Sequence, residues 1–135
     1  MELEHYFNEA VTKKSSDLHL VAGNRPYLRI DGELVTIGEE PLDNQELEEA
    51  VKKVVSPERM EAFYKNKELD FSIELLGHRF RLNLHYQENK IALAARLIKH
   101  EIPMPEEIYF DKTMIDLVRL RDGLVLVTGP SGCGK

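Results

Sequence analysis

The last seven residues constrain this chain most. Gly129, Pro130, Ser131, Gly132, Cys133, Gly134 and Lys135 read G-x-x-x-x-G-K, the P-loop pattern without its closing Ser or Thr. The unbroken apolar residues 124–127 and Thr128 come directly before it and predict a buried parallel strand. Strand and glycine-rich loop together predict the start of a nucleotide-binding domain, with a glycine-rich turn that binds nothing as the alternative.

Phosphate chemistry explains these residue types. Glycines let the backbone approach phosphates closely, and the loop N–H groups then bind anionic oxygens. Lys135 is expected on the β- and γ-phosphates of ATP, and the hydroxyl residue that normally follows would hold Mg²⁺. We expect ATP and Mg²⁺ as cofactors of the full-length protein. Because the hydroxyl residue is not among these 135 residues, we expect no ATP hydrolysis by this chain alone.

Composition narrows the class of protein. The net charge is −6, from 24 acidic and 18 basic residues, which argues against a general nucleic-acid surface. No apolar run approaches the roughly 18 residues of a membrane-spanning helix. The acidic start does not resemble a signal peptide, and a single cysteine, Cys133, allows no disulfide framework. We expect a cytoplasmic protein.

Periodicity predicts an α+β fold. Helical spacing of apolar residues indicates helices over 3–14, 43–55 and 57–64, and alternation indicates extended segments at 17–21, 27–30, 33–37, 71–75, 79–86 and 91–98. Turns are expected at Asp31-Gly32, at Gly77-His78 and over 87–90. The sum is an antiparallel sheet of about five strands with helices packed on it.

The chain is expected to divide into three parts. Residues 1–98 form the N-terminal domain, residues 99–110 form a linker stiffened by Pro103 and Pro105, and residues 111–135 begin a second domain. In that last part, Asp111 is expected to cap a helix that reaches Val118, and the strand and the P-loop follow.

Several short segments, in the same order along the chain, resemble the sequences of the PilT family of type IV pilus retraction ATPases. The resemblance covers nearly the whole chain, although residues 87–90 replace a turn that is often Arg-Gly and Cys133 stands where Ser is more frequent. The matching segments are Ser16-Asp17-Leu18-His19-Leu20, Gly23, Pro26, Arg29, Asp31-Gly32, Leu34, Asp70-Phe71-Ser72, residues 79–83, residues 96–98, and residues 123–130 with the P-loop.

The resemblance implies a fold and an activity. Members are hexameric secretion-superfamily ATPases in which a PAS-like N-terminal domain is linked to a RecA-like motor domain. This chain resembles the PAS-like domain followed by the first motor strand. The implied function is ATP-driven pilus retraction and twitching motility. The implied partners are a homo-hexamer and the pilus machinery at the inner membrane, where peripheral association is left open.

Other readings remain open. The chain could be an assembly or interaction module of a pilus-assembly or type II secretion ATPase. The short leader before Ser16 favours retraction. A stand-alone PAS-like sensory domain is a further alternative, although we see no polar residues that would converge on a ligand pocket.

Two arginines are the candidate catalytic residues. The family's N-terminal domains supply arginines toward the γ-phosphate, and the pattern matches Arg81 and Arg96 here. Arg96 lies between Ala95 and Leu97 in an apolar segment, which makes a purely solvated role less favourable, whereas Arg79 is taken as structural. Asp17 and His19 share one strand face and are expected to be a surface or hydrogen-bonded pair. The five histidines lack ligand spacing, so we expect no metal site.

Overall fold

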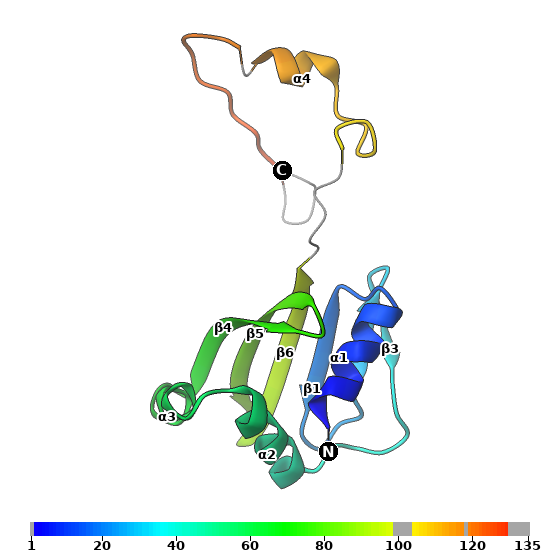
Figure 1. Cartoon of the computed structure of the whole chain (residues 1–135), viewed down its shortest axis with the longest axis vertical. Coiled ribbons are helices and arrows are strands. Elements are labelled where there is room, and N and C mark those ends of the chain that lie inside the picture. Colours follow the sequence, from blue (N-terminus) through cyan, green and yellow to red (C-terminus); the bar gives the residue numbers. More distant parts are fainter. Residues whose placement is uncertain (1, 99–103, 118, 130–135) are drawn as a thin grey trace. The chain divides into compact units, whose positions relative to one another are not determined.

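Figure 1 shows a computed structural model of the chain, which describes residues 2–98, 104–117 and 119–129. The chain divides into two compact units, Met1–His100 and Glu101–Lys135.

The first unit contains one antiparallel sheet with the strand order β3-β2-β1-β6-β5-β4. The α+β prediction is confirmed, but the sheet has six strands where about five were expected, because all the extended segments join a single sheet. The strands are β1 (Asp17–Val21), β2 (Tyr27–Ile30), β3 (Glu33–Thr36), β4 (Glu68–Leu75), β5 (His78–Gln87) and β6 (Lys90–Ile98).

Two-residue turns set the register of the hairpins. Asp31 and Gly32 both have positive φ, 49° and 88°, as the predicted turn requires. Glu88 and Asn89 make a similar turn, with φ of 51° and 62°, between the paired residues Gln87 and Lys90. The prediction of a Gly77-His78 turn was wrong by one residue. Leu76 and Gly77 form the turn, because His78 already pairs with Leu75.

Helices α1 (Leu3–Thr12), α2 (Asn44–Val54) and α3 (Pro57–Asn66) complete the first unit. Asp43 caps α2, since its Oδ1 accepts hydrogen bonds from the backbone N–H groups of Gln45 at 2.9 Å and Glu46 at 3.1 Å. Pro57 lies at the start of α3, as expected, whereas Ser56 makes no side-chain capping bond. Helix α1 ends two residues before the predicted end at residue 14.

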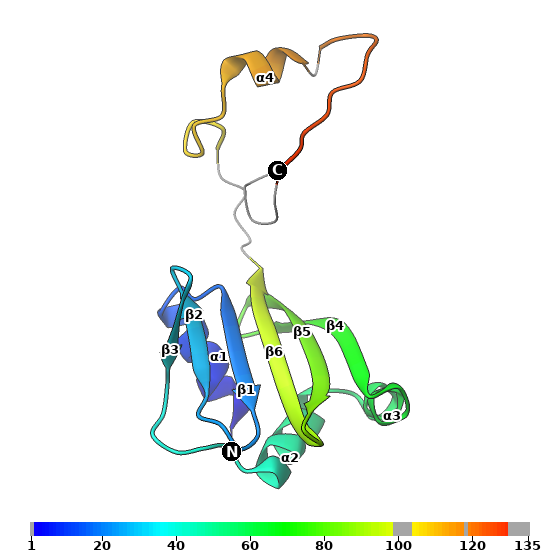
Figure 2. The same cartoon turned by 180° about the vertical axis from the view of Figure 1, so that it is seen from behind.

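The core lies between the helices and one face of the sheet (Figure 1). Phe7 of α1 packs edge-to-face on Phe80 of β5, with ring centroids 4.8 Å apart, and both side chains are buried. Leu47, Ala50 and Val51 of α2 join this core, as their helical spacing predicted. Within the described part of this unit, the opposite face of the sheet carries no helix (Figure 2).

The second unit contains the short helix α4 (Lys112–Leu117). Asp111 caps it, accepting the backbone N–H of Thr113 at 2.7 Å. The prediction of a buried strand at 124–128 is not met. These residues form no strand, and Leu124 and Leu126 are 81% and 74% exposed. A strand needs a neighbour for its backbone hydrogen bonds, and the described residues of this unit provide none.

Candidate functional site

A row of charged side chains crosses the helix-free face of the sheet. The register pairs Arg29 of β2 with Asp17 of β1, Asp17 with Arg96 of β6, and Arg96 with Arg81 of β5. Since paired residues in an antiparallel sheet point to the same face, the four side chains form one line across four neighbouring strands. The structure thus brings together the two candidate arginines, which lie 15 positions apart in sequence.

Asp17 and Arg96 form a hydrogen-bonded ion pair within this row. Arg96 Nε donates to Asp17 Oδ1 at 2.8 Å, and the two terminal nitrogens of Arg96 donate no hydrogen bond to any described residue. The Asp17 side chain is only 12% exposed, whereas that of Arg96 is 70% exposed. Burial raises the pKa of Asp17, but hydrogen bonds from Ser16 and Arg96 outweigh it, so the pKa lies below its usual range.

The second oxygen of Asp17 faces other partners. Ser16 Oγ donates to Asp17 Oδ2 at 2.8 Å, and Arg29 Nε lies 3.8 Å from the same oxygen. Arg29 also donates from Nη1 to the carbonyl of Gly32 at 3.0 Å, within the β2–β3 turn. Asp17 therefore has partners on both oxygens, and its position is fixed by two neighbouring strands as well as its own.

Arg81 has a separate carboxylate. Its Nε and Nη2 donate to the two oxygens of Asp70 on β4, at 3.0 and 2.6 Å, in a two-bond pair that is largely exposed. Hydrogen bonds from Arg81 lower the pKa of Asp70. Arg81 and Arg96 are thus adjacent but held by different acids, which offsets the repulsion expected between like charges paired across strands.

Burial corrects one part of the sequence argument for Arg96. Its apolar neighbours suggested a poorly solvated environment, but Ala95 points into the core and Arg96 points to the helix-free face. Alternation along β6 separates the two environments. Arg79, taken as structural, is exposed on the same face as Arg81, and it makes no ion pair with any described residue.

His19 lies next to this row and not within it. Its ring stacks on Tyr27, with centroids 5.2 Å apart, and its Nε2 is buried without a hydrogen-bond partner among the described residues. Burial lowers the pKa of His19, against the opposing effect of Asp17. No hydrogen bond joins Asp17 and His19, so the expected side-chain pair is only a near neighbour.

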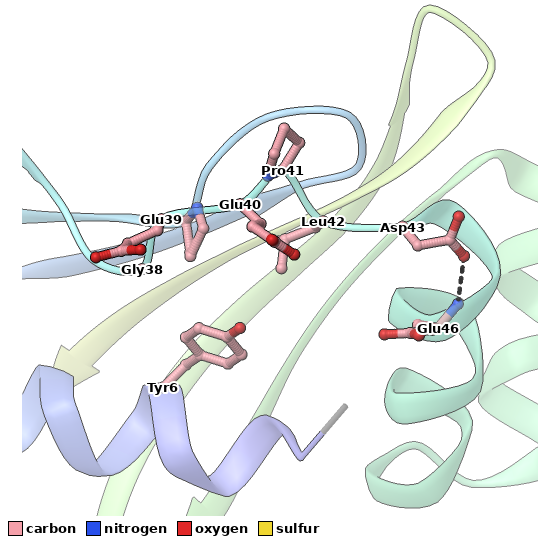
Figure 3. A pocket seen from close by; sticks show the side chains of 9 residues that line it. Tyr6, Gly38, Glu39, Glu40, Pro41, Leu42, Asp43 and Glu46 are labelled. Atoms are coloured by element: carbon pink, nitrogen blue, oxygen red, sulfur yellow. Dashed lines mark hydrogen bonds between the residues drawn. The ribbon is translucent and has the colours of Figure 1, made fainter.

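Within the first unit, a separate hollow of about 460 Å³ lies between α1, the loop at 38–43 and the start of α2 (Figure 3). Tyr6 forms its floor, and the lining includes the carboxylates of Glu39, Glu40, Asp43 and Glu46 and no basic side chain. A hollow of this charge repels phosphate groups. It is therefore a poor candidate for the nucleotide site predicted from the sequence.

The P-loop prediction falls almost entirely outside the described residues. Of the seven positions, only Gly129 is described. The others, Pro130, Ser131, Gly132, Cys133, Gly134 and Lys135, are not.

None of the helices formed by the described residues has the length and apolar character that a membrane-spanning helix needs.

Comparison with known proteins gives clear relatives. No protein-family model matches the chain. Over its whole length the chain is 32% identical to the type IV pilus ATPase PilU and 31% identical to the type IV pilus retraction ATPase PilT, both of Pseudomonas aeruginosa. It spans only 36% of that PilU and 40% of that PilT.

Solved structures agree with these relatives. A crystal structure of the pilus retraction motor PilT with bound ADP matches 98% of the chain at 32% identity and a TM-score of 0.82, with 39% of the PilT chain covered. The ATPase DotB of Legionella pneumophila matches with a TM-score of 0.81 at 22% identity, with 98% of this chain and 38% of that chain covered, and this shows a shared fold. Homologues of this chain thus include the N-terminal regions of PilT and PilU ATPases.

Proposed function

We propose, from this homology to the PilT and PilU pilus ATPases, that the chain is the N-terminal region of an ATPase that retracts type IV pili. The relatives are named as ATPases, and one of them as a retraction ATPase, over the whole length of this chain. A further relative, from Neisseria gonorrhoeae, is named as a twitching motility protein and is 30% identical over 111 residues, which are 82% of this chain and 30% of that protein.

Within this function, Arg81 and Arg96 contact the γ-phosphate of ATP bound to a neighbouring motor domain of a hexamer. The observation that carries this role is their placement side by side on the helix-free face, with side chains 66% and 70% exposed. Two guanidinium groups at adjacent register positions suit an anion with several oxygens. A guanidinium placed there neutralises charge that develops on the transferred phosphoryl group.

The charge balance of the row supports binding of an anion. The three arginines of the row outnumber the two carboxylates that pair with them, Asp17 in the row and Asp70 on β4, so this set of side chains keeps a net positive charge although the whole chain carries −6. The incoming phosphate does not displace Asp17, since Arg96 holds Asp17 through Nε and has two further nitrogens. ATP and Mg²⁺ would be held by the P-loop, with Lys135 on the β- and γ-phosphates.

Single substitutions of the two arginines in the full-length protein test the role. Arg81→Ala and Arg96→Ala are expected to lower kcat for ATP hydrolysis by at least about 10-fold, because each removes charge stabilisation from the transition state. Arg79→Ala, the matched control on the same strand face, is expected to keep the wild-type rate. Wild-type kcat in both of the first two variants would remove the phosphate role.

Retraction, as opposed to pilus assembly or secretion, is tested in cells. Deletion of the gene is expected to abolish twitching motility while surface pili remain. Loss of the pili themselves would instead support the assembly alternative, and loss of a secreted protein would support the secretion alternative.

The 135-residue chain alone is expected to give little heat when titrated with Mg-ATP, because it spans well under half of its ATPase relatives.

A further inference from the structure

We propose that Asp17 is a positioning residue for Arg96, holding its guanidinium by the Nε edge so that both terminal nitrogens remain available to a phosphate. The inference rests on the proposed function of Arg96. It adds a residue that the sequence argument treated only as a surface or hydrogen-bonded neighbour of His19.

Asp17 is suited to fix another side chain because it is itself fixed. Its side chain is 12% exposed, and each of its oxygens has a partner: Arg96 on Oδ1, and Ser16 with Arg29 nearby on Oδ2. The strand register also places Asp17 directly between Arg29 of β2 and Arg96 of β6. A carboxylate restrained in this way holds a long, flexible side chain in one orientation more firmly than an exposed acid does.

The point of attachment distinguishes Arg96 from Arg81. Asp70 accepts hydrogen bonds from both Nε and the terminal Nη2 of Arg81, so only one nitrogen of that guanidinium lacks a hydrogen bond to the described residues. Asp17 accepts a hydrogen bond only from the Nε of Arg96. The outer fork of a guanidinium, formed by its two terminal nitrogens, can bind two phosphate oxygens at once. Of these two arginines, Arg96 is therefore the one with both terminal nitrogens available to a phosphate.

When Asp17 is removed, a positioning role predicts a lower kcat, whereas the change in charge alone predicts no loss of kcat. Removing the carboxylate makes the row more positive, which by charge alone would strengthen the attraction for ATP. Positioning predicts that the transition state loses a correctly oriented fork. A misplacement of the order of an ångström costs about 100-fold in rate. The sign of the change in kcat therefore separates the two explanations.

The test measures kcat and KM for Mg-ATP in the full-length protein. Asp17→Asn is expected to lower kcat by about 10- to 100-fold without raising KM, and Asp17→Asn combined with Arg96→Ala is expected to be no slower than Arg96→Ala alone. Glu74→Gln is the matched control. It removes one negative charge from an exposed residue of β4 that makes no ion pair with any described residue, and it is expected to behave as wild type.

Arg96→Lys provides a second, independent variant. It keeps the positive charge but has a single ammonium group, which cannot hold Asp17 and present a fork together. Its kcat is expected to fall close to that of Arg96→Ala, with the melting temperature showing that the protein is folded. If Asp17→Asn prevents folding, a wild-type kcat in Arg96→Lys would still overturn the inference, because it would show that no held fork is needed.

The outcomes separate this inference from the proposed function. If Arg96→Ala is impaired while Asp17→Asn or Arg96→Lys stays within twofold of wild type, positioning by Asp17 is wrong and the phosphate role of Arg96 stands. If Arg96→Ala itself keeps the wild-type kcat, both the role of Arg96 and its positioning are overturned.

Discussion

The contact between Asp17 and Arg96 should stabilise the first unit by a measurable amount, although one partner is largely exposed. A hydrogen bond to a charged group contributes about 1.5–3 kcal/mol when it is well shielded, whereas an exposed ion pair contributes about 0.2–1 kcal/mol. The Nε–Oδ1 distance is 2.8 Å, Asp17 is 12% exposed and Arg96 is 70% exposed. Discounting for solvent at Arg96, we expect a coupling of about 1 kcal/mol between the two side chains.

The single variant Arg96→Ala should cost less than this coupling. Arg96 pairs directly with Arg81, and like charges opposite one another on adjacent strands repel by a few tenths of a kcal/mol or more. Removing Arg96 relieves that repulsion, so the net loss should be about 0.5 kcal/mol. Asp17 keeps its hydrogen bond from Ser16, so the far larger cost of an isolated buried charge does not arise.

Urea unfolding of the 135-residue chain, followed by far-ultraviolet circular dichroism, measures these terms. Arg96→Ala, Asp17→Asn and the double variant give the coupling as a double-mutant cycle. Arg79→Ala, an exposed arginine on the same face that has no ion pair in the described part of the chain, is the control. A coupling below about 0.3 kcal/mol would refute this account of the contact, because it would place the pair with fully exposed ones.

Three further predictions concern stability. Because the folded pKa of Asp17 lies below the reference value of 3.8, its contribution to the free energy of unfolding is present above that pH and is lost as the pH falls further. In Asp17→Asn, the free energy of unfolding should therefore fall less steeply with pH in this acidic range. Because burial lowers the pKa of His19 below 6.5, the unfolded state binds more protons below that pH. Stability should therefore drop as the pH falls through 6.5, and less so in His19→Gln; equal drops would contradict this. Phe7→Ala should cost about 3–5 kcal/mol in urea unfolding, since Phe7 is fully buried against Phe80, and a loss below about 1 kcal/mol would contradict the core described.

Much of the fold could be predicted from local patterns. The alternation of residues 79–86, the Asp31-Gly32 turn and the apolar spacing of 47–55 each report a local preference that packing reinforces, and the structure contains the corresponding elements. The one-residue error at Gly77 has a local cause as well. A leucine in the left-handed region is uncommon, so Leu76 gave no signal that it belonged to the turn.

The charged row could be predicted only in part. Arg81 and Arg96 came from a resemblance to a family, and the structure places them side by side. Their proximity to Asp17 could not be derived, because β1 and β6 are separated by most of the first unit in sequence and nothing local specifies that they pair. The strand expected at 124–128 failed for a related reason. A strand forms only beside another strand, and an apolar run cannot indicate whether a neighbour is present.

Hydrolysis of Mg-ATP by the full-length protein tests the central claim most directly. We expect turnover in the wild type, its loss in Lys135→Ala, and its reduction by at least about 10-fold in Arg96→Ala. A well-folded full-length protein that hydrolyses no ATP, or one whose rate is unchanged by both substitutions, would contradict the assignment of this chain to a pilus ATPase.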